Sequence, residues 1–184
     1  MYRLLAVLFI AIMSFSGISP AFGDSIDHDT GEVLKEGDML PSFSLSIQKD
    51  DVTSSFGDKE KTFVIVFFNT NCSDCKNELP VLQKFYANHL HDLQLVCVSR
   101  DFKGEYQSEE EIIHYWKLHH FTMPFVVQTD RNLYNQFARF GIPRIYIADS
   151  RRIIRKTFVT RVSYRQLCKA LKSINRKNNY HHHE

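Results

Sequence analysis

Two cysteines separated by two residues are the first feature of this sequence that could do chemistry. Cys72 and Cys75 enclose Ser73-Asp74, and a pair at this spacing can form a disulfide, exchange it with another disulfide, or supply half of a zinc site. The preceding segment 62–68 (TFVIVFF) is a continuous apolar, β-branched and aromatic run, which predicts a strand buried on both faces. The segment that follows the pair has apolar residues at three-to-four spacing, which predicts an amphipathic helix.

The position of the pair between a strand and a helix favours redox chemistry. Unpaired N–H groups and the dipole at a helix N-terminus stabilise a thiolate, which is the nucleophile in disulfide exchange. We therefore expect Cys72, nearer the loop, to attack, and Cys75, one turn into the helix, to resolve the mixed disulfide. A zinc site would need two further ligands, whereas Cys97 and Cys168 each stand alone. No metal is expected, and the redox-active Cys72–Cys75 disulfide is the only redox group expected.

The two remaining cysteines are interpreted as structural. Cys97 lies between two valines in a predicted strand, and Cys168 lies on the apolar side of the last predicted helix. Free cysteine behaves as a small hydrophobic residue when it is buried. A disulfide between Cys97 and Cys168 remains an alternative, because sequence gives no distance between them.

Segment 67–80 (FFNTNCSDCKNELP) resembles the active-site segment of thioredoxins, especially the exported reductases of cytochrome c maturation. The similarity extends to Gly37, Pro41 and Phe43, which resemble the first strand of that group. It also includes Gly141-Ile142-Pro143, which is similar to the loop where thioredoxins place a cis-proline against the disulfide. The resemblance covers most of the chain after residue 36 and implies a protein thiol–disulfide oxidoreductase.

The resemblance also implies roles for individual residues. Pro143 should follow a cis peptide bond, and Ile142 should offer its backbone to a bound substrate strand. Apart from the resemblance, the position of Arg144 directly after Pro143 leads us to expect that it contacts an incoming partner. Glu78 occupies the position where the cytochrome-maturation reductases carry a glutamate near the disulfide, so a partly buried carboxylate could relay a proton to or from Cys75. The alternative is an ordinary solvated glutamate on a helix.

The pair between the cysteines departs from the thioredoxin pattern, which has Gly-Pro there. Asp74 places a negative charge beside Cys72 and opposes thiolate formation by like-charge repulsion. We therefore predict that Asp74 favours the disulfide and makes the protein a reductant rather than a strong oxidant.

Two other functions on the same fold are kept as alternatives. A thiol peroxidase usually needs a threonine three residues before its reactive cysteine, but here Thr70 comes two residues before Cys72 and Asn69 three. An exported copper chaperone would use Cys72, Cys75 and a distant histidine, although such relatives generally space their cysteines one residue wider.

The remaining patterns supply the elements that must position the cysteine pair. Strands are predicted at 43–47, 62–68, 93–99, 125–128, 144–148 and 152–158. Helices are predicted after Cys75, after Asp130, and after the capping boxes that begin at Ser108 and Ser163. Alternating strands and helices followed by an antiparallel pair predict an α/β, thioredoxin-like fold. Its mixed central sheet would be flanked by helices and carry an N-terminal strand extension and an inserted helix.

The N-terminus has the pattern of an export signal. Arg3 precedes the apolar run 4–15, and Ala21-Phe22-Gly23 offers small residues for signal peptidase. We predict a signal peptide at 1–23, with an uncleaved membrane anchor as the alternative. A flexible lead-in at 24–36, a thioredoxin-like domain at 37–178 and a disordered tail at 179–184 complete the predicted organisation.

Charge and location indicate the expected partners. Lys plus Arg (23) nearly balances Asp plus Glu (21), so no nucleic-acid partner is expected. A periplasmic or otherwise exported reductase would act on oxidised exported proteins, with apocytochrome c as one candidate. A membrane thiol electron donor would return it to the reduced state.

Overall fold

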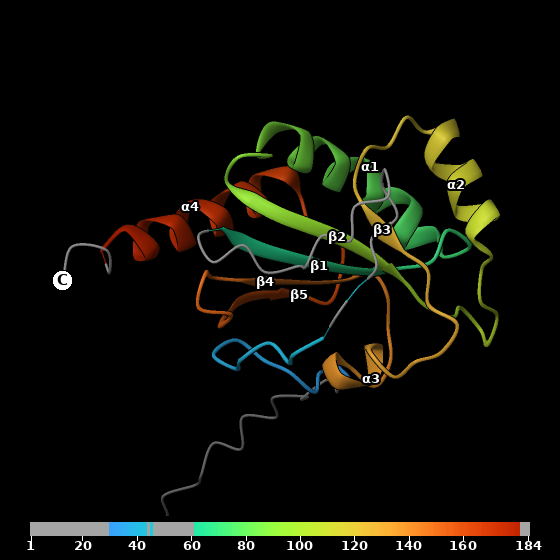
Figure 1. Cartoon of the computed structure of the whole chain (residues 1–184), viewed down its shortest axis with the longest axis horizontal. Coiled ribbons are helices and arrows are strands. Elements are labelled where there is room, and N and C mark those ends of the chain that lie inside the picture. Colours follow the sequence, from blue (N-terminus) through green and yellow to red (C-terminus); the bar gives the residue numbers. More distant parts are fainter. Residues whose placement is uncertain (1–29, 44, 46–60, 181–184) are drawn as a thin grey trace, which may run out of the picture.

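The computed structural model describes residues 30–43, 45 and 61–180 of the 184-residue chain. Within these residues, five strands form one mixed sheet in the order β3-β2-β1-β4-β5 (Figure 1). The strands are β1 (Thr62–Phe68), β2 (Leu93–Ser99), β3 (Phe125–Val126), β4 (Arg144–Ala148) and β5 (Ile154–Phe158). Strands β1, β2 and β3 are parallel, whereas β4 runs antiparallel to β1 and β5 runs antiparallel to β4. The predicted mixed sheet is confirmed.

Strand β1 is central because both of its faces are apolar. All seven of its residues are buried. Val64, Val66 and Phe68 belong to the hydrophobic cluster on one face of the sheet, and Phe63, Ile65 and Phe67 belong to the cluster on the other. The side-chain alternation of a strand produces this division, and it places the residues after β1 at the edge of a rigid core.

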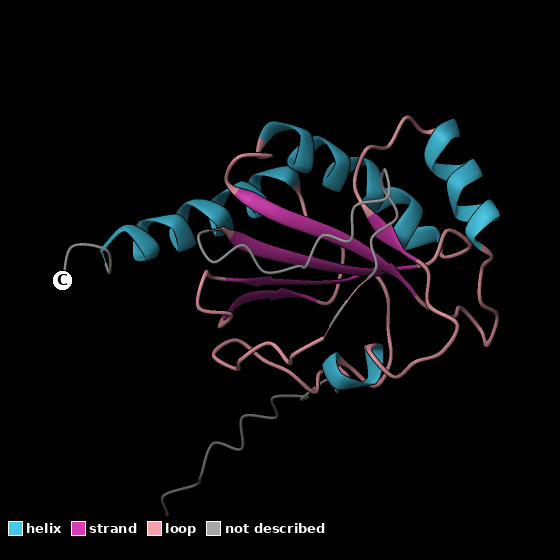
Figure 2. Cartoon of the chain, in the orientation of Figure 1, coloured by secondary structure: helices cyan, strands magenta, loops and turns pink. Residues whose placement is uncertain are grey.

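Helices cover the two faces of the sheet unequally (Figure 2). Helices α1 (Ser73–Asn88), α2 (Glu109–Leu118) and α4 (Tyr164–Tyr180) supply side chains to the same cluster on one face. The short helix α3 (Tyr134–Phe137) packs on the opposite face with residues of the N-terminal segment 30–45. The capping box at Ser108 is present as predicted, with both reciprocal hydrogen bonds formed.

The N-terminal segment differs from its prediction. The described residues of the predicted strand 43–47, Phe43 and Leu45, are not in a strand, and the rest of that stretch lies outside the described residues. Residues near 38 pair instead with the start of β5, where the Ile154 N–H donates to the Asp38 carbonyl at 2.8 Å. The arrangement of the whole sheet decides which segment pairs with these residues. Alternation of apolar and polar residues carries no information about that pairing.

The described part of the predicted lead-in, residues 30–36, makes contacts with the rest of the fold. The N–H groups of Val33 and Leu34 both donate to the Phe137 carbonyl, at 3.0 and 3.1 Å, and Leu34 packs against the hydrophobic cluster. The predicted signal peptide, residues 24–29 and residues 181–184 lie outside the described residues. In the described part of the chain, no helix combines the length and apolar character needed to cross a membrane.

Three predicted elements in the second half of the chain differ from their predicted bounds, and one of them, β5, begins at Ile154 rather than at residue 152. Strand β3 covers only 125–126 of the predicted 125–128. Asp130 does not cap α3 but accepts a hydrogen bond from the Asn132 N–H at 2.8 Å, and α3 begins four residues later. A short Asp side chain can close a turn on its own backbone in this way.

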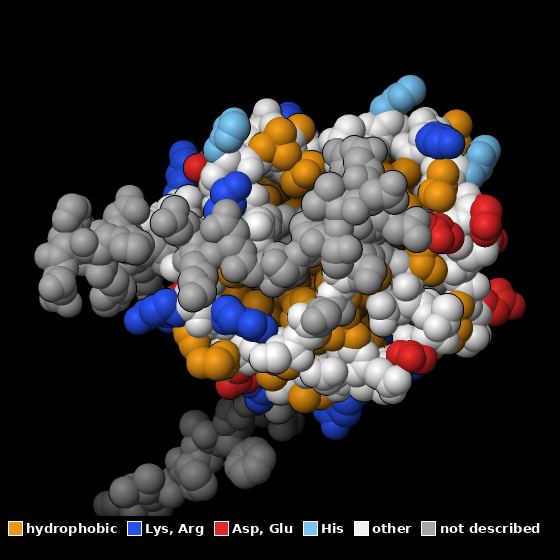
Figure 3. Space-filling model, in the orientation of Figure 1, with side chains coloured by type: hydrophobic (Ala, Val, Ile, Leu, Met, Phe, Trp, Pro, Cys, Tyr) orange, Lys and Arg blue, Asp and Glu red, His pale blue; other side chains and the backbone are white. Residues whose placement is uncertain are grey.

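Both signs of charge are present on the face of the molecule drawn in Figure 3, around hydrophobic side chains in its middle. The largest exposed hydrophobic side chains of the described residues are Val33, Met39, Leu90, Tyr106, Leu118 and Phe140.

Candidate active site

Cys72 stands between β1 and α1, as the sequence predicts. It is the N-cap residue of α1, with extended backbone angles (φ −82°, ψ 122°), and the helix begins at Ser73. The Cys72 side chain forms no hydrogen bond with the N–H groups of the first helical turn, but its place at the start of the helix is the one that the sequence predicts for the attacking sulfur. Its Sγ also lies 3.7 Å from the Ile142 carbonyl oxygen.

Cys75 lies one turn deeper and is completely buried. Burial raises the pKa of its thiol strongly, and a backbone hydrogen bond from Asn69 opposes the shift only in part. Negative charge at Cys72 and at Asp74, together with a hydrogen bond to the Cys72 side chain, raises the pKa of Cys75 further. Cys75 therefore keeps its proton at neutral pH until the reaction itself removes it.

Glu78 is buried, with 2% of its surface exposed, which excludes the solvated alternative. Both of its carboxylate oxygens accept from the Val162 N–H, at 3.2 and 3.1 Å. Burial raises the pKa of Glu78, while the Val162 hydrogen bond and the positive charge of Arg161 act in the opposite direction. Because residues three apart share a helix face, Glu78 follows Cys75 on the inner face of α1. The proton relay itself stays a prediction.

The loop before β4 faces the cysteine pair. The Ile142–Pro143 peptide bond is cis, as the resemblance implies. Three consecutive carbonyls of this loop accept hydrogen bonds from side chains. Arg144 donates to Phe140, the Tyr134 hydroxyl to Gly141, and the Cys72 thiol to Ile142. The loop is thus fixed along its length, with the Ile142 carbonyl turned toward the reactive sulfur.

The Arg144 side chain, which we expect to contact an incoming partner, is engaged within the chain in this structure. The residue is only 2% exposed, and its guanidinium donates to the carbonyls of Phe140 and Thr30. As the first residue of β4, two residues before Tyr146, it lies on the face of the sheet that carries Tyr146. Contact of Arg144 with a partner therefore stays a prediction.

A cavity of about 330 Å³ opens beside the loop. Its lining consists of Asp74, Ile142, Pro143, Val159, Thr160 and Arg161. Asp74 and Arg161 are both exposed, so the cavity has one acidic and one basic side chain next to the loop backbone.

Two buried polar residues that the sequence did not single out hold the loop before Cys72. Asn69 is fully buried; its Oδ1 accepts from the Asn71 N–H, and its backbone carbonyl accepts from the Cys72 N–H at 3.1 Å. Gln107 accepts from the Thr70 N–H at 2.8 Å and donates to the Thr70 hydroxyl. For Asn69, the available sequence signal was an Asn directly after a predicted strand. Nothing in the sequence indicates that Gln107 contacts Thr70.

The other cysteines lie away from this site, and all four are free thiols in this structure. Cys97 is fully buried in β2, where burial raises the pKa of its thiol. Cys168 on α4 is half-buried, and its Sγ lies 3.6 Å from the His89 Nε2. Within the described residues, no group of three or more His, Cys, Asp or Glu side chains is arranged to hold a metal ion.

A reactive cysteine at a strand–helix junction, a buried partner one turn below and a facing cis-proline loop define a thioredoxin-like thiol–disulfide oxidoreductase. The chain belongs to the AhpC/TSA family, whose model matches residues 37–157.

The sequence relatives of this chain share low identity with it. The chain is 22% identical over 134 residues to the thioredoxin-like protein YneN of Bacillus subtilis, covering 73% of this chain and 77% of that protein. It is 26% identical over 123 residues to the sporulation thiol-disulfide oxidoreductase A of the same organism, covering 66% and 72%. Among solved structures, a candidate protein disulfide isomerase from Bacteroides thetaiotaomicron aligns with a TM-score of 0.70 at 20% identity, covering 84% of this chain and 98% of that one. This structural match shows that the chain has the same fold as that protein.

Proposed function

We propose that the protein is an exported thiol–disulfide reductase that acts on oxidised exported proteins. The observation that carries the proposal is the position of the Cys72 sulfur. It lies at the N-terminus of α1 and 3.7 Å from the Ile142 carbonyl, with Cys75 buried one turn below. A substrate strand that pairs with the loop at Ile142 would bring its disulfide to this sulfur.

The reaction would proceed in two exchanges. The Cys72 thiolate attacks one sulfur of the substrate disulfide, a mixed disulfide forms, and the other substrate sulfur leaves as a thiolate that takes up a proton. Cys75 then loses its proton and attacks the Cys72 sulfur, which forms the Cys72–Cys75 disulfide and releases the second substrate thiolate. Glu78 is the carboxylate that we expect to accept the Cys75 proton, because it follows Cys75 on the buried side of α1 and burial raises its pKa.

The electrostatics of Cys75 supports the proposed reducing direction. A dithiol is a strong reductant when its reduced form gains little from ionisation, and a strong oxidant when a thiolate is greatly stabilised. Burial and the charge of Asp74 both raise the pKa of Cys75, so this thiol gives the reduced form no such stabilisation. A membrane thiol electron donor would reduce the disulfide again by the same exchange chemistry. Apocytochrome c is one candidate substrate.

The direction is tested by equilibrating the pair with glutathione or dithiothreitol redox buffers. A reduction potential near that of thioredoxin, about −270 mV, supports a reductase. A value near about −120 mV, typical of a strong oxidant, would contradict the direction while leaving the oxidoreductase chemistry intact.

Mixed-disulfide trapping tests the roles of the two cysteines. Cys75→Ser should retain a substrate peptide on Cys72 as a stable mixed disulfide, and Cys72→Ser should retain none. Cys168→Ser is the matched control, because this half-buried thiol lies outside the site, and it should behave as the unchanged protein. Equal trapping by both active-site variants would contradict the assignment.

Export is tested on the full chain in a bacterial host. We expect the protein in the periplasmic fraction with Asp24 as its first residue, or at the membrane with its N-terminus intact. An unprocessed chain in the cytoplasmic fraction would contradict export.

A further inference from the structure

We propose that Tyr134 is a positioning residue that holds the Gly141-Ile142-Pro143 loop in the orientation that Cys72 needs for reaction with a peptide disulfide. This proposal rests on the proposed oxidoreductase function and deepens it. Tyr134 lies on α3, outside the cysteine motif and outside the loop, and its residue type at this position carries no sequence signal of a role in the site.

The hydroxyl of Tyr134 is the direct link to the loop. It donates to the Gly141 carbonyl at 2.6 Å, and the residue is 2% exposed. Its ring packs edge-on against the ring of Phe67 in the central strand, with centroids 5.1 Å apart and planes at 88°. The hydroxyl is therefore anchored to the most rigid part of the sheet.

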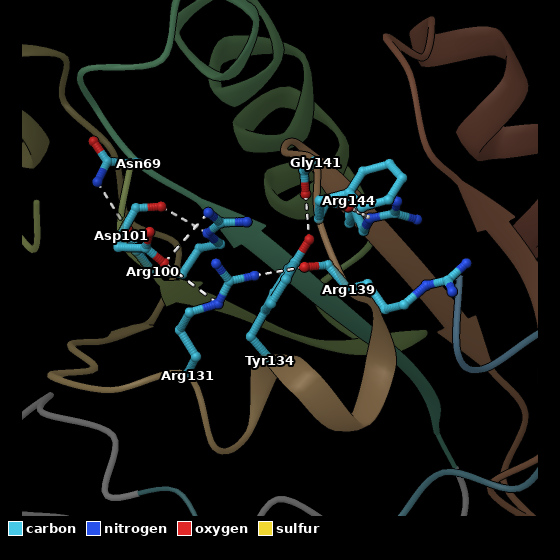
Figure 4. A network of polar contacts seen from close by, with 9 residues as sticks. Asn69, Arg100, Asp101, Arg131, Tyr134, Arg139, Gly141 and Arg144 are labelled. Atoms are coloured by element: carbon cyan, nitrogen blue, oxygen red, sulfur yellow. Dashed lines mark hydrogen bonds and ion pairs between the residues drawn. The ribbon is translucent and has the colours of Figure 1, made fainter. Parts of the chain in front are cut away.

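Two guanidinium groups fix the ring further (Figure 4). Arg100 and Arg131 lie over it, 4.5 and 5.2 Å from its centroid, at distances where a cation is attracted to an aromatic face. Both arginines pair with the buried carboxylate of Asp101, at 3.3 and 3.7 Å. Arg131 also donates to the Arg139 carbonyl at 2.6 Å, close to the same loop.

The same network reaches the cysteine. The Arg100 carbonyl accepts from the Asn69 side-chain amide at 2.8 Å, and the Asn69 carbonyl accepts from the Cys72 N–H. A series of contacts thus joins the two segments that must face one another in the reaction. It runs from Cys72 through Asn69, Arg100 and Tyr134 to Gly141. Each is held to the other through buried side chains rather than through the substrate.

Gly141 makes this restraint necessary. Its φ of +90° is in the left-handed region that favours glycine, and a Cβ at this position would lie 3.3 Å from the Arg144 guanidinium. Glycine is also the residue with the greatest freedom to rotate its neighbouring peptide groups. With the Gly141 carbonyl held by Tyr134, the next carbonyl, that of Ile142, stays directed toward the Cys72 sulfur.

Tyr134→Phe removes this hydroxyl and keeps the ring. The matched control is Tyr146→Phe, because Tyr146 is also buried on the same side of the sheet and its hydroxyl also donates to a backbone carbonyl, that of Phe137, at 2.8 Å. Phe137 lies outside the loop. Each variant loses one hydrogen bond from a buried tyrosine to a backbone carbonyl, part-buried for Tyr134 and buried for Tyr146, so the loss of thermal stability should be no greater for Tyr134→Phe.

The readouts are the reduction of a peptide disulfide and the reaction of the thiols with a small aromatic disulfide, which is too small to pair with the loop backbone. For Tyr134→Phe we expect kcat/KM on the peptide disulfide to fall roughly 5- to 10-fold, the range that one hydrogen bond supplies. Its rate with the small disulfide should be unchanged, and Tyr146→Phe should match the unchanged protein on both substrates.

Two results would overturn the inference: equal peptide rates for the two variants, or an equal loss on both substrates in Tyr134→Phe. An unchanged protein that reduces neither substrate would instead contradict the proposed function, so the two failures are distinguishable.

Discussion

Asn69 offers a strong test of how the cysteine loop is held, because its side chain is fully buried and bonded at both ends. In Asn69→Ala, the Arg100 carbonyl loses the amide donor at 2.8 Å and the Asn71 N–H loses its acceptor at 2.8 Å. An orphaned buried group costs roughly 1–3 kcal/mol, and a lost partly buried hydrogen bond about 0.5–1.5 kcal/mol. The expected loss in the free energy of unfolding is therefore about 2–4 kcal/mol.

For a chain of this size, each kcal/mol lowers Tm by about 2–4 °C, so the variant should melt roughly 5–15 °C lower. Urea unfolding of the reduced protein, followed by circular dichroism, gives the free energy directly, and the m-value should not change. The matched control is Asn88→Ala, whose side-chain amide donates to the Tyr164 hydroxyl at 3.2 Å in an exposed setting. Its expected loss is under about 0.5 kcal/mol. Losses for the two variants that agree within about 0.5 kcal/mol would refute the reasoning.

Other predictions follow from burial. Because the pKa of Glu78 is raised in the fold, the folded state binds its proton more tightly, and stability is lost as pH rises through the raised pKa. Gln does not titrate, so the Tm of Glu78→Gln minus the Tm of the unchanged protein should increase as pH rises from acid to neutral. A Tm difference that does not change with pH would contradict this. In the reduced native protein, iodoacetamide with mass spectrometry should modify the half-buried Cys168 and leave the buried Cys97 unmodified until unfolding; early loss of the Cys97 thiol would contradict the burial. Arg144→Lys gives up the two-nitrogen contact with the Phe140 carbonyl and should cost roughly 2–4 kcal/mol in urea unfolding, whereas a cost near zero would show that the guanidinium is dispensable.

The parts of the fold that local pattern determines were predictable from the sequence. Segment 62–68 is apolar at every position and became the central strand β1. The spacing of Cys72 and Cys75 at a strand–helix boundary placed both thiols as observed. The resemblance around Pro143 led to the cis peptide bond. Each of these depends on residues close together in the chain.

The parts that depend on distant partners were not predictable. The burial of Glu78 was undecided because its partner, the Val162 N–H, lies 84 residues away. The inward direction of Arg144 depends on a carbonyl 114 residues away. Alternation at 43–47 suggested a strand because it reports exposure on two faces, but the hydrogen-bond partner that a strand requires comes from the arrangement of the whole sheet.

The contact between Arg144 and Thr30 has a practical consequence for shortened versions of this protein. The guanidinium that holds the Phe140 carbonyl also holds the carbonyl of residue 30. A chain cut at residue 37, where the family match begins, would remove one acceptor of a cation that stays inside the fold. Recombinant versions intended to keep the loop intact should therefore start upstream of Thr30.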